Sequence, residues 1–470
     1  MVGGIKTKYR CAGFWMLAAF LLVVLWPGGS AWCDVQVVPQ TVRVGLMQNT
    51  PQVSFVLQGA YKVINVNTGQ VIAEDGEGQW TVEYAAGLCR VTKDGQDVGL
   101  YNGPIKAEGL NASVKAILSG GDILLQKESL AGLTVQGGDV HYIYENQANC
   151  YALAEKDRLK QLSWGGLNIV GLEEGGQVKR YRGNLEIRTS ENYLTVINEL
   201  PIEQYLYGVV PAEMPVSFPS EALKAQAVVA RSYLHAQLGS YASFGFDVLD
   251  NQSNQVYQGY DGENPVASGA VDATSGMVLA YCGQPIAAFF HSSSGGFTEN
   301  SEDVWFETLN FIRSKEDPYD NNGKHYDWSV TYSTGELVAL INQQLKKYIP
   351  SSEFIELASI TDLKELERTA SGQRVKILLI EGIDAGGSPR VYTIANADRV
   401  RNVLGLRSAL FTMQKQTDPD EGISGVTFNG SGSGHGLGMS QYGAAGWAGQ
   451  GYSFQDILQY YYTGVELIKY

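Results

Sequence analysis

Cysteine and histidine are scarce in this chain. Its 470 residues contain five of each, and only Cys89, Cys150 and Cys282 follow the first 33 residues. The sequence has no Cys-x-x-Cys pair, Cys/His cluster or His-Glu-x-x-His spacing, so no metal site is expected. Three cysteines are too few for a disulfide framework. A single Cys89–Cys150 bridge and three small buried side chains both stay open as interpretations.

Positive charge is also in short supply. Lys and Arg total 34 against 49 Asp and Glu, which gives a formal net charge of -15 at pH 7. Phosphate recognition requires a basic surface, so nucleic acid is excluded as an expected partner. The glycine-rich stretch near the C-terminus contains neither Gly-x-Gly-x-x-Gly nor Gly-Lys-Ser/Thr, and a nucleotide site is therefore not expected.

The N-terminus has the features of an export signal. Lys and Arg side chains precede an apolar run from about residue 11 to residue 26, and a Pro and small residues follow it. The run is at the short end for a membrane-spanning helix. Residues 1–33 are therefore predicted to be a signal peptide or an N-terminal membrane anchor. The remainder is expected on the extracellular face of the cytoplasmic membrane or in the cell wall, with membrane contact only through this segment.

The rest of the chain predicts an α+β protein. Residues 36–165 alternate apolar and polar side chains between short turn signals, which is typical of a β-rich accessory module. The alternation continues through 168–200. Residues 220–238, "SEALKAQAVVARSYLHAQL", then form the clearest helix pattern, with Ser220 as its cap and Gly239 at its end.

Further elements are expected closer to the C-terminus. Residues 335–347 read as a second helix, followed by strands at 374–382 and 390–396. A last helix starts with a capping box, Ser453 with Asp456. The glycine-rich stretch 431–454 runs straight into this helix and carries His, Gln, Met, Tyr and Trp, which a flexible linker does not need.

Glu213 occupies a stretch with three prolines, "PAEMPVSFP". Proline fixes φ, so the sequence predicts a stiff loop whose carboxylate has a defined direction. The alternative is a solvated loop carboxylate, or an anion near the N-terminus of the following helix.

Lys224 and Arg231 lie seven residues apart on the predicted helix and share one of its faces. Such a pair can receive an anionic ligand or simply form a solvated face. Another polar motif, "AAFFHSSSGGFTEN" (287–300), joins His291 to serines, yet no Gly-x-Ser-x-Gly elbow is present. A turn with a packed His is the favoured interpretation there.

Together these segments resemble the sporulation stage II protein D family, also called the amidase-enhancer family. The motifs occur in the family's order over about residues 180–470, and they are "VVPAEMP" with "ALKAQAVVARSYL", "HSSSGGFTENSEDVW", "RVRNVLGLRSALF", "GSGHGLGMSQYGAAGWA" and "ILQYYYTG". The resemblance implies that residues 180–470 are a mixed α/β catalytic region whose prominent Ala-rich helix follows the catalytic loop.

The resemblance also implies an activity, a peptidoglycan lytic transglycosylase that prefers glycan strands without stem peptides and acts in sporulation engulfment or wall remodelling. Glu213 matches the family's catalytic glutamate. The positions implied to bind substrate are Lys224, Arg231, His291, His435, Gln441 and Tyr442. Lys224 and Arg231 are hypothesised to hold the lactyl carboxylate of N-acetylmuramic acid. Some zinc-bearing relatives carry cysteines where Leu249 and Asn254 stand here, so no cofactor is expected.

A second function from another class stays open, a non-catalytic wall-binding enhancer of an N-acetylmuramoyl-L-alanine amidase. In both interpretations the partners are peptidoglycan strands and other wall hydrolases or an amidase. An enzyme needs one carboxyl group with a raised pKa, because the sugar's own C6 hydroxyl serves as nucleophile, whereas hydrolysing glycosidases usually need two.

Overall fold

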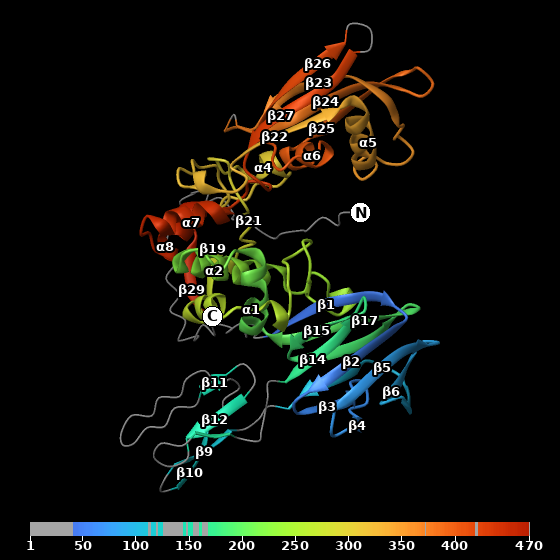
Figure 1. The fold of residues 1–470 in the computed structure, drawn as a ribbon, viewed down its shortest axis with the longest axis vertical. Helices are drawn as coiled ribbons and strands as arrows, with labels where there is room; N and C mark the ends of the chain where they lie inside the picture. Colours follow the sequence, from blue (N-terminus) through green and yellow to red (C-terminus); the bar gives the residue numbers. More distant parts are fainter. Residues whose placement is uncertain are drawn as a thin grey trace, which may run out of the picture. The chain divides into compact units, whose positions relative to one another are not determined.

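The computed structural model describes residues 41–110, 114–118, 121–125, 144–146, 149–153, 159–161, 168–371, 373–418 and 422–469 (Figure 1). The expected signal or anchor at 1–33 lies outside the described residues. Helices and strands occur together along the chain, which confirms the α+β fold class. In the described ranges, no helix is both long enough and apolar enough to cross a membrane.

Strands from residues 41–109 and 169–201, with β18 (Val248–Leu249) from further along the chain, build two N-terminal sheets. One sheet has the order β18 (Val248–Leu249), β1 (Thr41–Thr50), β17 (Tyr193–Pro201), β16 (Asn184–Ser190), β8 (Ile105–Gly109), β3 (Tyr61–Asn65), β4 (Val71–Ala73). Another has the order β15 (Gln177–Arg182), β14 (Ile169–Glu174), β2 (Gln52–Gln58), β5 (Gly78–Ala85), β6 (Leu88–Lys93), β7 (Gln96–Tyr101). Between β8 and β14, the sequence contains further short strands, which are β9 (Val114–Leu118), β10 (Gly121–Leu125), β11 (Tyr144–Asn146), β12 (Asn149–Leu153) and β13 (Leu159–Gln161).

The alternation seen in the sequence positions the side chains of these strands. In β2, Val53, Phe55 and Leu57 are buried, and Phe55 stacks on Trp80 of the neighbouring β5. Cys89 is a free, buried thiol in the same core. Strands before residue 110 and after residue 168 share each sheet, so the sheets extend across the interval 165–180 where the sequence suggested a division.

A helical layer follows β17 directly. It contains α1 (Ile202–Glu213), α2 (Ser220–Gln237), α3 (Pro265–Ala273), α4 (Ser301–Val304), α7 (Gln441–Gly449) and α8 (Phe454–Tyr461). Short 3-10 turns occur at Ala242–Phe244, Tyr260–Gly262 and Asp320–Asn322. The layer shares a hydrophobic core with the N-terminal sheets, and Ala222, Ala225, Ala227 and Ala230 of α2 are buried in it.

The Ala-rich helix is confirmed, but its predicted cap is wrong. Pro219 is the residue that precedes α2, no side chain caps the helix, and Ser220 is already its first residue. Proline is favoured at helix starts because it has no N–H to satisfy. The capping box of Ser453 and Asp456 at α8 is confirmed.

Two small sheets connect the helical layer to the C-terminal segment. The order β20 (Gln284–Pro285), β19 (Met277–Tyr281), β29 (Glu466–Lys469) forms one sheet. In another, β21 (Phe290–His291) pairs in parallel with β28 (Met439–Ser440). Residues 439–469 therefore return to the helical layer.

Residues 327–431 form a separate hydrophobic core of their own. Its strands are β22 (Asp327–Ser333), β27 (Gly422–Ser431) and β26 (Phe411–Asp418) in one sheet, and β23 (Leu357–Arg368), β24 (Val375–Asp384) and β25 (Pro389–Ala395) in another. Two helices, α5 (Thr334–Leu345) and α6 (Ala397–Val403), pack on them. The expected second helix and both expected strands are confirmed here. We call residues 327–431 the inserted region.

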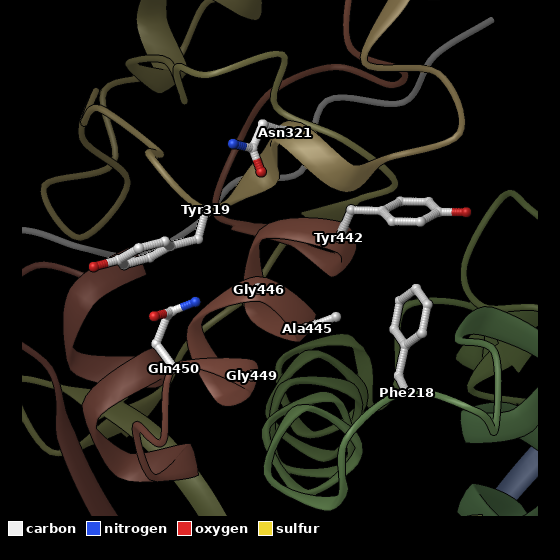
Figure 2. A pocket seen from close by; sticks show the side chains of 8 residues that line it. All are labelled: Phe218, Tyr319, Asn321, Tyr442, Ala445, Gly446, Gly449 and Gln450. Atoms are coloured by element: carbon white, nitrogen blue, oxygen red, sulfur yellow. The ribbon is translucent and has the colours of Figure 1, made fainter.

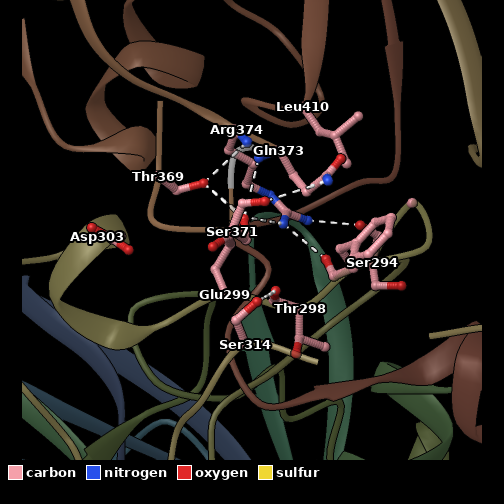
Figure 3. A network of polar contacts seen from close by, with 12 residues as sticks. Ser294, Thr298, Glu299, Asp303, Ser314, Thr369, Ser371, Gln373, Arg374 and Leu410 are labelled. Carbon is pink, nitrogen blue, oxygen red and sulfur yellow. Dashed lines mark hydrogen bonds and ion pairs between the residues drawn. The ribbon is translucent and has the colours of Figure 1, made fainter. Parts of the chain in front are cut away.

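A buried ion pair joins the inserted region to the "SSSGGFTEN" motif (Figure 3). Arg374, 1% exposed, donates to the backbone oxygens of Phe297 (2.8 Å) and Ser294 (2.7 Å) and pairs with Glu299 at 3.3 Å. Glu299 also accepts bonds from Thr369 and Ser371. Because a buried charge is costly without partners, this network holds the base of the inserted region against the motif.

Candidate active site

Glu213 lies at the C-terminal end of α1, with Pro211 inside the last turn of the helix. The expectation that residues 211–219 form a proline-bounded loop is therefore wrong for its first part. Tyr205, Leu206, Val209 and Val210 are buried on the same helix, and this apolar stripe keeps the backbone helical in spite of the proline. The loop begins only after Glu213, at Met214.

The Glu213 carboxyl group is half-buried, and its environment favours the neutral form. Burial raises its pKa above the ordinary value of 4.5, and the opposing effect is the backbone N–H of Val256, which donates to Oε1 at 2.8 Å. Among the described residues, no Lys or Arg forms an ion pair with this carboxylate. The C-terminal end of a helix carries partial negative charge, which also disfavours an anion. The group is therefore suited to hold a proton.

The loop that presents Val256 is held by side-chain amides. Asn254 Oδ1 accepts from the backbone N–H of Leu249 at 3.0 Å, and Asn251 Oδ1 accepts from Ser253 at 3.0 Å. The family resemblance implies cysteine ligands at the positions of Leu249 and Asn254 in zinc-bearing relatives, and neither side chain here is a thiolate. The residues present do not fit a zinc site, and hydrogen bonds close the loop instead.

Gln441, the first residue of α7, connects the glycine-rich stretch to Glu213. Its Nε2 donates to the backbone oxygen of Glu213 at 2.9 Å and to Oε1 of Gln226 at 3.4 Å. Gln441 is 8% exposed and Gln226 is fully buried. The resemblance implied that Gln441 is a substrate ligand, whereas its amide is occupied by the backbone oxygen of Glu213.

Glycines let the stretch around Gln441 approach its neighbours closely. Gly438 has φ +68, and a Cβ at this position would lie 2.0 Å from the backbone oxygen of Phe289. At Gly446, a Cβ would lie 2.0 Å from the backbone oxygen of Tyr319. Only glycine avoids these overlaps. The stretch is an ordered part of the site and not a linker.

Next to this contact lies an open hollow of about 490 Å³. Figure 2 shows Phe218 and Tyr442 side by side at one end and Tyr319 and Gln450 at the other, with Asn321 above. The Phe218 and Tyr442 rings are 5.1 Å apart, edge to face. Ala445, Gly446 and Gly449 follow Tyr442 at helical spacing and complete the lining. We call this hollow the α7 groove.

Two buried carboxyl groups hold one wall of the α7 groove. Asp320 accepts from Ser293 Oγ (2.7 Å) and Ser440 Oγ (2.8 Å), and Asp317 accepts from Ser294 Oγ (2.9 Å) and the Tyr461 hydroxyl. Burial and the neighbouring Asp320 raise the pKa of Asp317 to about 7. Ser293 and Ser294 are therefore structural anchors, and in the part of the chain that the structure describes the His291 ring bonds to the backbone oxygen of Leu437 and not to a serine.

Comparisons with known proteins agree with this arrangement. A family model described as "Stage II sporulation protein" matches residues 190–281, which contain Glu213, α2 and Val256. A second model, a domain of unknown function, matches residues 299–438 and encloses the inserted region.

The chain is 32% identical to stage II sporulation protein D of Bacillus subtilis over 286 residues, 58% of this chain and 75% of that protein. The protein of that name from Bacillus amyloliquefaciens is 33% identical over 286 residues. The chain belongs to the stage II sporulation protein D family. The amidase enhancer of Bacillus subtilis is also related, at 34% identity over 301 residues that cover 56% of this chain and 40% of that protein.

In this member of the stage II sporulation protein D family, Arg231 is not free to bind a substrate. It is 1% exposed, and its guanidinium pairs with Glu203 through two hydrogen bonds of 2.9 and 2.6 Å. Nη1 also donates to the backbone oxygen of Met277 at 3.1 Å. The hypothesis that Arg231 holds the lactyl carboxylate is therefore wrong, because this cation lies inside the fold.

Lys224 has a different environment on the same helix. Its ammonium group pairs with Glu221 at 2.6 Å, and its side chain is 26% exposed. Glu221 also accepts from the backbone N–H of Phe454, the first residue of α8. Lys224 and Arg231 share one helix face, but each forms its own ion pair, the first at the surface and the second buried. The two side chains therefore do not form a two-cation site.

The two histidines of the motifs lie together, and within the described residues neither forms a hydrogen bond with Glu213. The rings of His291 and His435 are 5.5 Å apart, and Trp305 lies 5.3 Å from His435. Burial lowers the pKa of both, to about 4 for His435. His291 is 5% exposed, so the prediction that it binds substrate is wrong, and the favoured turn with a packed His is confirmed.

Of the predicted substrate positions, Tyr442 lines the α7 groove. Sequence reasoning missed Phe218, Tyr319, Asn321 and Gln450. Phe218 lies five residues after Glu213, and an aromatic side chain in the loop that follows Glu213 is a signal that points to it. Tyr319 and Asn321 come from a segment without any such signal, because their place depends on Asp317 and Asp320.

Proposed function

We propose that this protein is a lytic transglycosylase that cleaves the glycan strands of peptidoglycan in the cell wall during sporulation. The names of the related proteins, stage II sporulation protein D and amidase enhancer, support a role in sporulation and the cell wall. The observation that carries the enzymatic part is the half-buried Glu213 carboxyl group with its raised pKa.

Glu213 performs both proton transfers in the proposed reaction. As an acid it gives its proton to the glycosidic oxygen that leaves C1 of N-acetylmuramic acid, and the C1–O bond breaks. The resulting carboxylate then takes the proton of the C6 hydroxyl of the same sugar, whose oxygen bonds to C1. The products are a shortened strand and a 1,6-anhydro end, and no water is consumed. Such a group must be protonated in the resting protein, which burial favours.

The neighbours of Glu213 support this role by their chemistry. Val256 binds Oε1 and fixes the direction of the carboxyl group, and Gln441 binds the backbone oxygen of the same residue. With its carboxyl group oriented by Val256 and its backbone held by Gln441, Glu213 loses little freedom when it reaches the reacting oxygen.

The test is to incubate the purified protein with glycan strands stripped of stem peptides and to detect 1,6-anhydro sugars by mass spectrometry. The wild type and a Glu353→Gln control, altered at an exposed carboxyl group, are expected to form product. Glu213→Gln is expected to form at least about 100-fold less, as removal of a general acid typically does. Equal product from Glu213→Gln, or none from the wild type, contradicts the proposal.

A second function is favoured by the relation to an amidase enhancer. In that case the protein binds the wall and stimulates an N-acetylmuramoyl-L-alanine amidase without cleaving glycan. Stimulation of such an amidase by Glu213→Gln to the wild-type level, with no anhydro product from either protein, identifies this function.

A further inference from the structure

Tyr257 is a buried phenol that directly follows Val256, and the steps proposed for the reaction leave it without a role. It is 5% exposed. Its ring lies 5.0 Å from the ring of Tyr205 on α1 and 5.9 Å from the ring of Tyr181 on β15. Burial raises the pKa of Tyr257, so its hydroxyl keeps the proton that it donates. The side chain thus lies between the helix that ends in Glu213 and an N-terminal sheet.

The Tyr257 hydroxyl has an acceptor whose direction is fixed. It donates to Oδ1 of Asn198 on β17 at 3.0 Å, and Asn198 is fully buried. The amide nitrogen of Asn198 donates to the backbone oxygens of Arg182 at 2.7 Å and Asn184 at 3.0 Å. Reversing this amide would turn its oxygen toward two carbonyl oxygens, so its orientation is set. The hydroxyl is therefore tied to the N-terminal sheet.

The backbone beside Tyr257 is tied to α1. The N–H of Gln258 donates to the backbone oxygen of Gly208 at 3.2 Å, and Gly208 lies five residues before Glu213 on the same helix. A Cβ on Gly208 would lie 2.8 Å from Cε2 of Tyr257, so glycine lets the ring lie directly on the helix. These contacts fix the chain next to Val256, whose N–H is directed at Glu213.

The bond from Val256 acts mainly on the ionised form of Glu213. A backbone N–H binds a carboxylate more strongly than a neutral carboxyl group, and this bond opposes the rise in the pKa of Glu213 that burial causes. In the proposed reaction the carboxylate persists between the two proton transfers. Within the described residues, Val256 is the recorded donor to this carboxyl group. The position of its N–H therefore affects how readily Glu213 releases its proton.

We propose that Tyr257 is a positioning residue, which holds the N–H of Val256 against the Glu213 carboxyl group and thereby stabilises the carboxylate that forms when the proton leaves. Asn198 supports it from β17. The part of Tyr257 in catalysis rests on the proposed function, whereas its effect on the ionisation of Glu213 does not.

Other titratable groups face Glu213 or share the loop of Tyr257. Tyr205 of α1 and Tyr233 of α2 interact electrostatically with Glu213, and burial raises the pKa of both, so both stay neutral near pH 7. Asp250 begins the turn that ends at Tyr257. Burial and the nearby Glu174 raise the pKa of Asp250 to about 6.

Two charged groups also face the Tyr257 hydroxyl, Glu263 and Arg182, and they pair with each other at 2.6 Å. This pair stays intact in every variant below. All measurements are made on the full chain with Asp250→Asn, which removes the titration of Asp250.

The ionisation of Glu213 is measured by thermal melts, as the Tm of Glu213→Gln minus the Tm of the Glu213 protein between about pH 4 and pH 9. This difference grows with pH and levels off once Glu213 is ionised in the folded protein. Tyr257→Phe keeps the ring and removes the bond to Asn198, and it is expected to move the levelling upward by about one pH unit. Tyr392→Phe, which removes a hydroxyl bonded to backbone in the inserted region, is the matched control and should leave it unchanged.

Catalysis on stripped strands is the second readout. In Tyr257→Phe, kcat is expected to fall about tenfold, and its alkaline limb should move upward by the same interval of about one pH unit. KM should stay unchanged, because Tyr257 is buried. Asn198→Ala removes the acceptor instead and should reproduce both effects, and the double variant should add no further shift.

A fall in kcat without a shift in either pH dependence indicates packing alone and overturns the proposal, as does loss of folding in both Tyr257→Phe and Asn198→Ala. The proposed function fails separately. If the wild type forms no anhydro product but Tyr257→Phe moves the levelling, Tyr257 positions Val256 in a protein that does not cleave glycan. If product forms with the same rate and pH dependence in Tyr257→Phe, the lytic activity stands and the positioning role fails.

Discussion

The amide of Gln441 is hydrogen-bonded to the backbone oxygen of Glu213 at 2.9 Å, across 228 residues of sequence. This bond joins the start of α7 to the end of α1 and places Tyr442 beside Phe218. The glycine-rich stretch thus holds the backbone of the candidate catalytic residue through Gln441, and its Tyr442 forms one end of the α7 groove.

Replacement of Gln441 tests whether this support matters for the reaction. Gln441→Ala removes the bonds to Glu213 and Gln226, and kcat on stripped strands is expected to fall about tenfold, equivalent to 1.4 kcal/mol. KM should change less, because the amide is already occupied by protein. Gln343→Ala, at an exposed position of α5, is the control. An unchanged kcat, or a rise confined to KM, contradicts a positioning role.

Glu213→Gln is expected to stabilise the folded protein at neutral pH while it abolishes cleavage. Burial raises the pKa of Glu213, so this group favours folding below its ordinary pKa of 4.5 and loses that contribution as pH rises through the folded pKa. Gln removes the buried anion and keeps an acceptor for Val256. Tm measured at pH 7 should be higher for the variant, and the difference should shrink at pH 4. A lower Tm at pH 7 contradicts the raised pKa.

Arg231 and Lys224 are expected to differ sharply in stability although they share a helix face. Arg231→Met leaves Glu203 without its partner and should cost about 3–5 kcal/mol of unfolding free energy. Lys224→Met breaks a surface pair with Glu221 and should cost about 1 kcal/mol or less. Urea unfolding measures both. Equal small costs would mean that the Arg231–Glu203 pair does not stabilise the fold.

Gly438→Ala is expected to destabilise the protein by about 3 kcal/mol or more, since φ is +68 and a Cβ would lie 2.0 Å from the Phe289 oxygen. Gly269→Ala, in α3 with nothing within 4 Å of its Cβ, should be neutral or stabilising by up to about 1 kcal/mol. Denaturant unfolding of both variants provides the comparison. A tolerated alanine at position 438 would show that the close approach of this backbone to Phe289 is not required.

The Asp317 carboxyl group is expected to make the stability fall between about pH 4 and pH 7. Its pKa is raised from 3.8 to about 7 by burial and by Asp320, so its favourable contribution is complete below 3.8 and is lost as pH rises through about 7. Asp317→Asn keeps an acceptor for Tyr461 and should flatten this slope in Tm against pH. The wild-type slope persisting in the variant would assign it to other groups.

Local patterns predicted much of the secondary structure. Alternation identified the strands of the N-terminal sheets, and the α2 and α8 helices follow from helical periodicity and from residues typical of helix ends. The Glu213 segment was misjudged at Pro211, because burial of Tyr205, Leu206, Val209 and Val210 outweighs one unfavourable residue. Periodicity records which residues prefer to be buried, and it does not record how much one proline costs against them.

The burial of polar and charged side chains decided which of the candidate ligand residues can reach a substrate, a question that their spacing in the sequence left open. Lys224 and Arg231 have equivalent positions in a helical pattern, yet Glu203 and the backbone around Met277 enclose only Arg231. His291 and His435 were grouped with the ligands by motif and are packed beside each other instead. The sequence pattern does not show this outcome, because the free-energy cost of burying an ion or an imidazole depends on partners from distant segments.

The sequence by itself determined that Glu213 is the candidate acid, that a helix follows it and that the glycine-rich stretch is not a linker. Only the tertiary structure decided what the stretch does. Glycines without Cβ atoms let it reach the segments of Phe289 and Tyr319, and the resulting contacts bring Gln441 to Glu213 and Tyr442 to Phe218. Hydrogen bonds and ring contacts act over a few ångströms, so residues from positions 213 to 450 form one site only when the chain has folded.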